Sequence, residues 1–183
     1  MKKMREFVHL HNHTHFSLLD SITEPKQLIE AAISDGQRAI ALTDHGVMFG
    51  CFQFYKLANK LGIKPILGME AYVANGSRRE RISGKSKDRK EKNYFHLVLL
   101  AKDLQGYKNL MRLTTLAHTE GFYYKPRIDR ELLEKYHDGL IATGACMAGE
   151  INHHLIYNEI DKAREAATFY KDLFGDDFYI ELQ

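Results

Sequence analysis

Histidine residues are concentrated near the start of this sequence, where four of them fall within seven positions. The imidazole group of histidine is the commonest metal ligand in proteins. His9, His11 and His13 alternate with other residues, which is the period of a β-strand, so all three would point from one face. The run begins with the apolar residues Phe7 and Val8, whereas a histidine-rich tail or an expression tag would be featureless and polar. The pattern therefore predicts a strand whose imidazoles bind a metal ion.

Other residues with ligand side chains follow the ends of further predicted strands. His45 follows the second strand, Glu70 lies in the outgoing part of the third, and Cys146 follows the fifth. The carboxyl ends of parallel strands in a barrel converge on one face, and that face carries function. Nitrogen, oxygen and sulfur donors together favour zinc or manganese over calcium, because imidazole and thiolate are poor calcium ligands. A carboxylate such as that of Glu70 can bridge two ions.

His96 breaks this rule, because it lies at the beginning of its predicted strand. If the third strand extends past the rim of the barrel and the chain returns antiparallel to it, His96 would lie beside Glu70. Asp44, which precedes His45, would either orient a ligand by hydrogen bonding or form part of a turn. His9 flanks the histidine pair and is a second candidate for such an orienting role.

The remaining histidines are predicted to lie outside the metal site. A lone histidine is more often a hydrogen-bonded core or surface residue than a ligand. Cys51 lies in an apolar helical stretch and is predicted to belong to the core. The histidines predicted to be at the surface are His118, His137, His153 and His154.

Hydrophobic periodicity predicts strands that alternate with helices along the chain. Parallel neighbouring strands need such crossover helices, so the order of the elements favours an α/β fold. Thr23 is the expected N-cap of the first helix, and Gly36 is its expected end. The predicted strands cover residues 6–13, 38–43, 66–73, 94–101, 139–143 and 178–183. The predicted helices cover residues 24–35, 47–61, 104–117, 131–136, 147–157 and 160–173.

The composition is that of a single globular domain. The 183 residues are 44% hydrophobic and 27% charged, which is enough for one core, and we expect one domain over residues 1–183. The formal net charge of +2 is too small to indicate nucleic-acid binding by itself. Residues 75–93 carry eight basic and three acidic side chains, and this pattern favours a solvated surface arm over a DNA contact.

The cysteines and the apolar segments indicate the cellular setting. The two cysteines, Cys51 and Cys146, form no CxxC pair and give no disulfide framework, which suits a reducing compartment. No apolar run is long enough to cross a membrane, and the N-terminus has no apolar signal segment. We therefore expect a cytoplasmic protein without a membrane partner.

Six ordered segments of the sequence form a more specific pattern. They are HNHTHFSLLD (11–20), TDHG (43–46), GMEAYV (68–73), HLVLLA (96–101), GFYYKPR (121–127) and CMAGE (146–150). Together they closely resemble the polymerase and histidinol phosphatase (PHP) domain family, over essentially the whole chain. More narrowly, they resemble the version that opens the alpha subunit of bacterial replicative DNA polymerase III. An HxH run alone would be a weak signal, since metal-dependent amidohydrolases also carry one on a first barrel strand.

The resemblance implies a distorted TIM-like barrel of seven βα units with a cleft for up to three metal ions, zinc or manganese. In the implied reaction the nucleophile is a metal-bound hydroxide, and no side chain is assigned as the base. Glu70 would bridge two ions, and Lys125 and Arg127 would contact phosphate or DNA. The implied metal ligands are His11, His13, Asp20, His45, Glu70, His96 and Cys146.

The end of the sequence departs from the family pattern. The family closes its site with an Asp-x-His pair on a late strand, and no such pair occurs after Glu150. We therefore expect an N-terminal fragment that lacks the last barrel units and the polymerase domains. Such a fragment would leave part of the core exposed, so we expect poor stability alone and impaired metal affinity.

The resemblance also implies a function in DNA replication, as part of a DNA-directed DNA polymerase, which is a nucleotidyltransferase. The expected activity of the domain is metal-dependent phosphoester hydrolysis, and in the intact protein 3′ to 5′ exonucleolytic proofreading. The expected partners are the primer 3′ end of DNA and other replicase subunits, including a proofreading exonuclease subunit. One alternative is a stand-alone phosphatase of the histidinol phosphate type, which the basic segment and the GFYYKPR loop disfavour. The other is a non-catalytic, metal-stabilised scaffold that docks the exonuclease.

Overall fold

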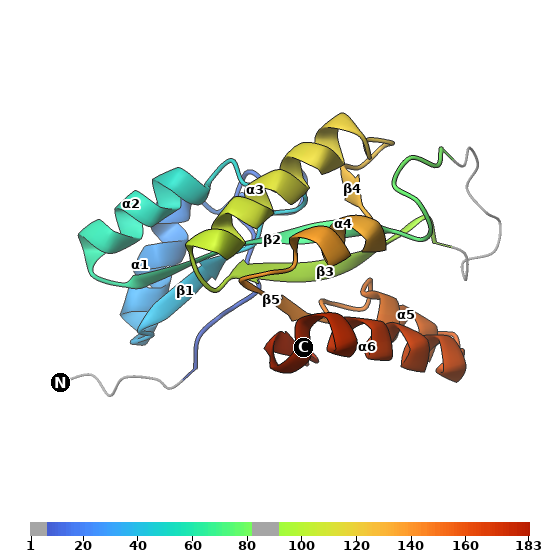
Figure 1. The fold of residues 1–183 in the computed structure, drawn as a ribbon. Helices are drawn as coiled ribbons and strands as arrows, with labels where there is room; N and C mark the ends of the chain where they lie inside the picture. The colour runs from blue at the N-terminus through green and yellow to red at the C-terminus, as the bar shows by residue number, and fades with distance from the viewer. Residues whose placement is uncertain (1–6, 82–91) are drawn as a thin grey trace.

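The computed structural model describes residues 7–81 and 92–183, in which strands and helices alternate over most of the chain (Figure 1). The strands are β1 (Ala39–Leu42), β2 (Lys64–Ala74), β3 (Tyr94–Ala101), β4 (Arg127–Ile128), β5 (Leu140–Thr143) and β6 (Phe178–Tyr179). The helices are α1 (Pro25–Asp35), α2 (Cys51–Leu61), α3 (Leu104–Thr119), α4 (Arg130–Tyr136), α5 (Glu150–Ile156) and α6 (Ile160–Phe174). The described strands join one sheet in the order β1, β2, β3, β5, β6, with β4 beside β2.

The sheet is mixed, because β3 runs antiparallel to both of its neighbours, β2 and β5. The other pairs, β1 with β2, β2 with β4 and β5 with β6, are parallel. The expected α/β fold is confirmed, and so is the parallel pairing of β1 and β2, which α2 connects. Between β2 and β3 the described residues form no helix, so the chain returns without a crossover and the pair is antiparallel.

The alternation of side chains along each strand gives the sheet two different faces. On β2, Met69, Ala71 and Val73 are buried in the main core cluster, to which α3, α4 and α6 contribute. The intervening residues, Glu70 and Tyr72, therefore point from the opposite, inner face. The helices cover the outer face, and the inner face can gather polar side chains.

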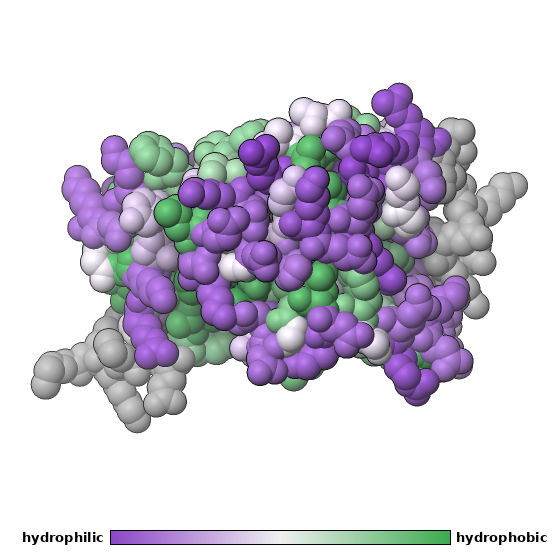
Figure 2. Space-filling model, viewed as in Figure 1, coloured by the Kyte–Doolittle hydropathy of each residue, from purple (hydrophilic) through white to green (hydrophobic). Residues whose placement is uncertain are grey.

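Helices α1 and α2 lie side by side next to β1 (Figure 1). Ile29 of α1 and Phe54 of α2 pack with Ile40 and Leu42 of β1 in a second core cluster. Cys51 belongs to this cluster and is buried, so its predicted place in the core is confirmed. Figure 2 shows a mainly hydrophilic surface on the viewed side, with small apolar areas between polar side chains. The helices thus bury their apolar sides and leave their polar sides in water.

The two ends of the sheet approach each other through the segments that flank β1 and β6. Residues 7–13, predicted as a strand, form no regular strand, but they run beside β1 through bonds from Ala41 N–H to the His9 carbonyl and from Thr43 N–H to the Asn12 carbonyl. Beyond β6, the carboxylate of Glu181 reaches the imidazole of His11 in this first segment. The predicted sixth strand is shorter than expected, since only Phe178 and Tyr179 pair with β5.

The boundaries of most helices agree with the sequence pattern to within a few residues. Glu24 and not Thr23 is the N-cap of α1, because the Gln27 side chain accepts the Glu24 N–H in a capping box. Gly36 ends the helix as expected, in the left-handed conformation at φ +83°. Helix α2 begins at Cys51, later than predicted, and the short strand β4 was not predicted.

Several polar residues expected at the surface are buried. His153 and His154 are 2% and 8% exposed, because α5 packs its histidines against Phe95 of β3, with ring centroids 5.4 and 5.5 Å apart. Arg78 was counted in the basic arm but is 3% exposed and pairs with Asp129 at 3.0 Å. Residues 82–91 of that arm lie outside the described residues. No described helix is both long and apolar enough to cross a membrane.

Candidate metal centre

Glu70 lies at the middle of a polar cluster on the inner face of the sheet. Its side chain is 1% exposed, and both carboxylate oxygens face imidazole rings. Its Oε1 is 3.2 Å from Nε2 of His11 and 2.9 Å from Nδ1 of His96. Its Oε2 is 2.7 Å from Nδ1 of His45 and 3.3 Å from Nε2 of His13. One buried carboxylate therefore joins histidines from the N-terminal segment, the loop after β1, and β3.

The donor atoms of the cluster form three overlapping groups, each compact enough to hold one metal ion. Within each group the donor atoms lie within 4.8 Å of one another. Glu70 belongs to two of these groups, and the two oxygens of its carboxylate could serve one ion in each, whereas a neutral imidazole offers a single lone pair. The groups are His11, His13 and Glu70; His13, Asp20 and His45; and His45, Glu70 and His96.

Cys146 lies beside the third group. Its Sγ is 3.9 Å from Oε1 of Glu70 and 4.0 Å from Nδ1 of His96. The hydrogen bond with His96 lowers the pKa of the Cys146 thiol, and the Ala148 amide acts in the same direction against the effect of burial. A thiol with a lowered pKa forms the thiolate that metal ions bind. The position of Cys146 and its lowered pKa would allow its sulfur to bind a metal ion held by the third group.

The pairing of β2 with its neighbours brings two histidines to Glu70. His45 lies just beyond β1, where Gly46 N–H donates to the Glu70 carbonyl at 2.9 Å. On the other side, the antiparallel register sets His96 opposite Tyr72, two residues from Glu70. His96 and Glu70 are thus diagonal neighbours on one face of the sheet. Because β3 runs antiparallel to β2, His96 lies beside Glu70 although it is near the beginning of its strand.

The buried residues Asp44 and Ser17 orient His13. The Ser17 hydroxyl donates to Oδ1 of Asp44 at 2.7 Å, and it accepts the backbone N–H of His45 at 3.1 Å. Nδ1 of His13 is also 3.1 Å from Oγ of Ser17. Because the hydroxyl proton goes to Asp44, we assign Nδ1 of His13 as the donor of this bond. Nε2 of His13, 3.3 Å from Oε2 of Glu70, is then the nitrogen left for a metal ion.

Backbone strain lies next to two of the expected ligands. Leu19 and Ala145 adopt left-handed conformations, at φ +68° and +54°. This region costs a residue with a Cβ roughly 1 kcal/mol or more. Leu19 precedes Asp20, whose Oδ2 is 3.0 Å from Nε2 of His45, and Ala145 precedes Cys146. Since the Leu19 side chain is fully exposed, apolar burial does not explain its conformation, and strain of this kind is typical of functional sites.

Protons balance the charge of the cluster. Burial raises the pKa of Glu70, but hydrogen bonds from the surrounding histidines, His11 first, hold it well below its usual range. Burial lowers the pKa of His11, but Glu181 and Glu70 outweigh it and raise that pKa to about 10. Burial lowers the pKa of His96 as well, but Cys146 and Glu70 outweigh it and raise that pKa to about 9. The metal-free cluster therefore holds protons at neutral pH where metal ions would place positive charge.

Two buried atoms of the cluster support the fit of a metal ion. Among the described residues, Nδ1 of His45 and Oε2 of Glu70 are the buried side-chain nitrogen and oxygen atoms without a hydrogen bond. They lie 2.7 Å apart, but their relative orientation is wrong for a hydrogen bond. Buried polar atoms in folded proteins nearly always have a partner. An ion held by the third donor group would satisfy both atoms, so the residues fit divalent metal ions.

Two residues that the sequence suggested for the site lie away from it. His9 is exposed, and its ring packs against Phe7 with centroids 4.9 Å apart. Arg127 is 3% exposed, and its guanidinium donates to the backbone carbonyls of Gly121 and Arg78, among others. The guanidinium is therefore used to hold the backbone, and the structure does not support a phosphate contact by Arg127.

Lys125 lies near the mouth of the cluster. Its side chain is exposed, and Nζ is 5.2 Å from the centre of the Tyr72 ring. The Tyr72 ring in turn stacks on His45, with centroids 5.8 Å apart. Lys125 is therefore a solvent-exposed positive charge on the Tyr72 side of the cluster.

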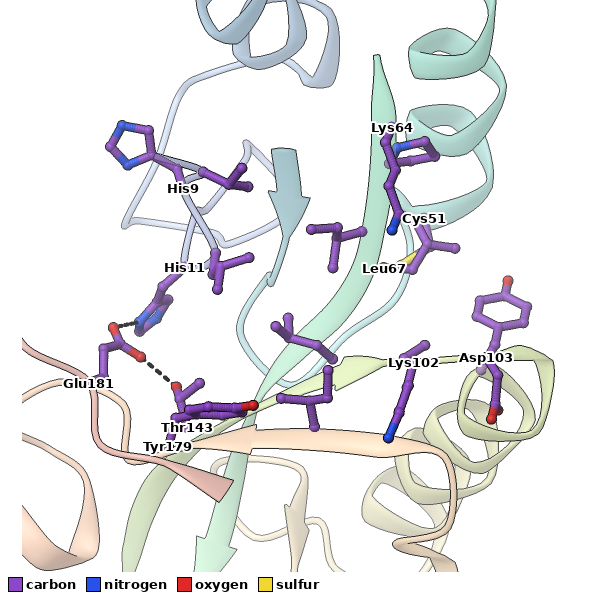
Figure 3. A pocket seen from close by; sticks show the side chains of 18 of the residues that line it. His9, His11, Cys51, Lys64, Leu67, Lys102, Asp103, Thr143, Tyr179 and Glu181 are labelled. Atoms are coloured by element: carbon purple, nitrogen blue, oxygen red, sulfur yellow. Dashed lines mark hydrogen bonds and ion pairs between the residues drawn. The ribbon is translucent and has the colours of Figure 1, made fainter. Parts of the chain in front are cut away.

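The structure adds two residues that sequence reasoning did not assign. The hydroxyl of Ser17 orients His13, although Ser17 was noted only as part of the SLLD segment. A carboxylate oxygen of Glu181 lies 2.7 Å from Nδ1 of His11, although Glu181 was expected only as part of the last strand. Figure 3 marks this contact with a dashed line. A carboxylate near the end of a predicted strand is the same signal that indicated Glu70, and it could have indicated Glu181.

Comparison with known proteins places the chain in a family. The model of the PHP domain matches residues 9–183. The chain belongs to the PHP domain family. This PHP domain is 52% identical over 180 residues to DNA polymerase III subunit alpha of Aquifex aeolicus, with 98% of this chain and 16% of that protein covered. It is 48% identical over 177 residues to the protein of the same name from Borreliella burgdorferi, with coverage of 97% and 15%. The PHP domain thus spans only about one sixth of the length of these relatives.

Solved structures resemble the PHP domain only weakly. An amidohydrolase from Chromobacterium violaceum is 22% identical, with a TM-score of 0.42, and the match covers 61% of this chain and 32% of that one. A score this low supports no conclusion about function.

Proposed function

We propose that this PHP domain binds up to three divalent metal ions, zinc or manganese, and hydrolyses phosphate esters. The observation that supports this most strongly is the set of three overlapping donor groups around the buried carboxylate of Glu70. The mixture of imidazole, carboxylate and thiol suits these two metals better than calcium. The proposed ligands are His11, His13, Asp20, His45, Glu70, His96 and Cys146.

The residues of the chain prepare the site for this chemistry. Once bound, the ions would lower the pKa of a water molecule and stabilise negative charge on phosphoryl oxygens. Glu70 is ionised and faces two donor groups at once, so it can hold adjacent ions at a fixed separation. Asp20 is 53% exposed, whereas Glu70 is 1% exposed, so the group that contains Asp20 is the one open to solvent and to a substrate.

The proposed substrate is a DNA 3′ end, from which a nucleotide would be removed in the 3′ to 5′ direction. Lys125 is proposed to contact a phosphate, since its ammonium lies on the Tyr72 side of the cluster. Burial, together with the charges of Tyr94 and Glu70, raises the pKa of the Tyr72 hydroxyl above its usual value. The hydroxyl therefore stays protonated and can donate a hydrogen bond to a phosphoryl oxygen.

The experiment that tests this proposal compares nuclease and phosphatase activity in one preparation. The protein loaded with zinc or manganese is given a labelled primer with a mismatched 3′ end, and separately a small phosphomonoester. Trimming of the primer that is lost in His13→Ala and kept in His118→Ala supports the exonuclease. His118 is the control because it lies outside the three donor groups and bonds to the carbonyl of Thr114 on its own helix. Turnover of the monoester alone would instead support a histidinol-phosphatase-like activity, and the absence of both would refute hydrolysis.

The role of Lys125 is tested by Lys125→Gln, with Lys135→Gln as the matched control. Both ammonium groups lie over a tyrosine ring, at 5.2 and 5.4 Å, but Lys135 packs on Tyr136 of α4. We expect KM for the primer to rise severalfold in the first variant and to stay unchanged in the second. Equal KM values in the two variants would remove Lys125 from the proposed substrate site.

A second candidate function is a metal-stabilised scaffold. The cluster ties the N-terminal segment to β2 and β3, which are distant in the sequence, so bound ions would crosslink the fold. In this case His13→Ala would lower the thermal stability of the metal-loaded protein, and no phosphate ester would be turned over by either protein.

The setting of the domain in a larger protein is also a proposal. The relatives named DNA polymerase III subunit alpha support a place in a replicative DNA polymerase, in the cytoplasm, with DNA and other replicase subunits as partners. A proofreading exonuclease subunit is the partner that the scaffold function would require.

A further inference from the structure

Glu181 lies at the seam where the end of the described sheet meets its beginning. Its Oε1 is 2.7 Å from Nδ1 of His11, a residue 170 positions earlier in the sequence. Its Oε2 accepts a hydrogen bond from Oγ1 of Thr143 at 2.5 Å. Figure 3 shows the three side chains in this order, His11 and Thr143 on either side of the Glu181 carboxylate. None of the three donor groups of the metal centre includes Glu181.

The backbone places Glu181 here independently of its side chain. β6 pairs with β5 so that Tyr179 lies opposite Thr143, and Gly144 N–H donates to the Tyr179 carbonyl at 3.0 Å. Thr143 is the last residue of β5, and Cys146 follows it in the same loop. Glu181 therefore lies two residues beyond the paired backbone, and its carboxylate is held by a hydroxyl on the neighbouring strand.

The surroundings shield the bond between Glu181 and His11 from water. The two side chains are 15% and 12% exposed. They lie at one edge of a cavity of about 1190 Å³ whose other lining residues are mostly apolar, including Leu10, Leu100 and Ile141. A hydrogen bond to a charged group is stronger in such surroundings than in water.

The geometry fixes which nitrogen of His11 is free for a metal. An ionised carboxylate only accepts hydrogen bonds, so the proton between Glu181 and His11 is on Nδ1. The other nitrogen, Nε2, faces Glu70 at 3.2 Å, and it is the atom that a metal ion would bind in place of a proton. Metal-binding histidines commonly donate their second N–H to a carboxylate, which sets both the tautomer and the ring orientation.

We propose that Glu181 is a positioning residue for His11: it holds the imidazole so that Nε2 is presented to a metal ion in the group formed with His13 and Glu70. The inference rests on the proposed metal binding, but it does not require that the site be catalytic. It adds a residue from the far end of the described chain to a site whose ligands come from earlier segments. The contact that joins the two ends of the sheet would then also support the metal centre.

The test measures zinc binding to the purified protein by competition with a chelating dye, for Glu181→Met and for a matched control, Glu159→Met. Glu159 makes the same kind of bond, at 2.8 Å to Nδ1 of His154, away from the metal centre. We expect Glu181→Met to weaken the binding of one zinc ion by about 10- to 100-fold. We expect Glu159→Met to bind zinc within about twofold of the parent, because its histidine is outside the proposed site.

A conservative variant separates positioning from simple structural loss. In Glu181→Gln the amide oxygen can still accept the Nδ1 proton but without charge assistance, so zinc binding should lie between that of the parent and Glu181→Met, at least about threefold weaker than the parent. Glu181→Gln keeps the volume of the side chain, so it tests the positioning role even if Glu181→Met does not fold. Zinc binding equal to the parent in Glu181→Gln and in any folded Glu181→Met, with lower stability alone, would make Glu181 a structural residue and overturn the proposal. A parent protein that binds no zinc would refute the metal centre itself, and this inference with it.

Discussion

The stability of the metal-free protein should fall as the pH is raised from about 6 to about 10. His11 and His96 both have pKa values above the ordinary value of 6.5, at about 10 and about 9. A group whose pKa is raised by folding stabilises the folded state fully below its unfolded pKa, and this contribution is lost as the pH rises through the folded value. Glu70 has the opposite shift, so its contribution is present above its ordinary value of 4.5 and is lost in acid. The cluster therefore stabilises the metal-free fold most between about pH 4.5 and 6.5.

The magnitude follows from the size of the shifts. One pKa unit corresponds to about 1.4 kcal/mol, so the rises from 6.5 to about 10 and about 9 set upper limits of about 5 and 3 kcal/mol. The two values do not add, because both imidazoles interact with Glu70 and the same attraction is counted in each. We expect a loss of about 3 kcal/mol over this pH range, which is a large part of the stability of a typical domain.

The assay is urea unfolding in the presence of a metal chelator at about pH 6, 8 and 10, followed by far-UV circular dichroism. The control is Glu70→Gln, whose neutral side chain removes the part of the attraction for protons on His11 and His96 that is due to Glu70, and leaves the parts due to Glu181 and Cys146. Because tyrosines and lysines also titrate at the upper end of this range, the quantity to compare is the difference between the parent and the variant. In excess zinc the trend should reverse, since metal ions compete with protons for the same nitrogens and zinc binding strengthens as the pH rises.

One result would refute this reasoning. If the free energy of unfolding of the metal-free parent stays constant or rises relative to that of Glu70→Gln between about pH 6 and 10, the imidazoles do not hold protons through Glu70. The charge balance of the cluster would then need a different description.

Three further variants test the parts of the structure that support the site. Arg78→Met should lower the free energy of unfolding by about 3–5 kcal/mol, because it leaves the buried carboxylate of Asp129 without its charged partner, while Arg79→Met, 63% exposed, should cost less than about 1 kcal/mol in the same urea titration. Gly106→Ala should lower the thermal midpoint markedly, since its Cβ would lie 1.8 Å from the backbone oxygen of Gly139; an unchanged midpoint would contradict this packing. Ser17→Ala should weaken zinc binding by about 10-fold in calorimetry, and unchanged binding would remove its orienting role.

The sequence indicated several of the proposed metal ligands because their spacing follows the geometry of β-strands. His11 and His13 alternate in an extended segment, and His45 follows a buried strand, so their convergence follows from the rule that strand ends meet. His96 is different, since its place beside Glu70 depends on the direction of β3. That direction is a property of the sheet, and local periodicity carries no information about which strand pairs with which.

Burial of polar residues was the least predictable part of the fold. His153 and His154 occur in a short polar segment and were expected in water, but α5 packs between β3 and α6. Arg127 was expected to contact phosphate or DNA, yet its guanidinium holds backbone carbonyls. A charged side chain is stable in the interior when its partners are in place, and partners from distant segments are not visible in the local sequence.

By itself, the sequence determined the types of ligand, the elements that carry most of them, and the α/β class, because these depend on residue chemistry and on the periods of strands and helices. Only the tertiary structure decided that the Glu70 carboxylate is buried among four imidazoles, that Ser17 and Asp44 set the tautomer of His13, and that Glu181 meets His11 across 170 residues. The physical reason is that hydrogen bonds and charge pairs act over a few ångströms. Which distant residues come that close is settled by the pairing of strands and the packing of helices, and not by any short stretch of sequence.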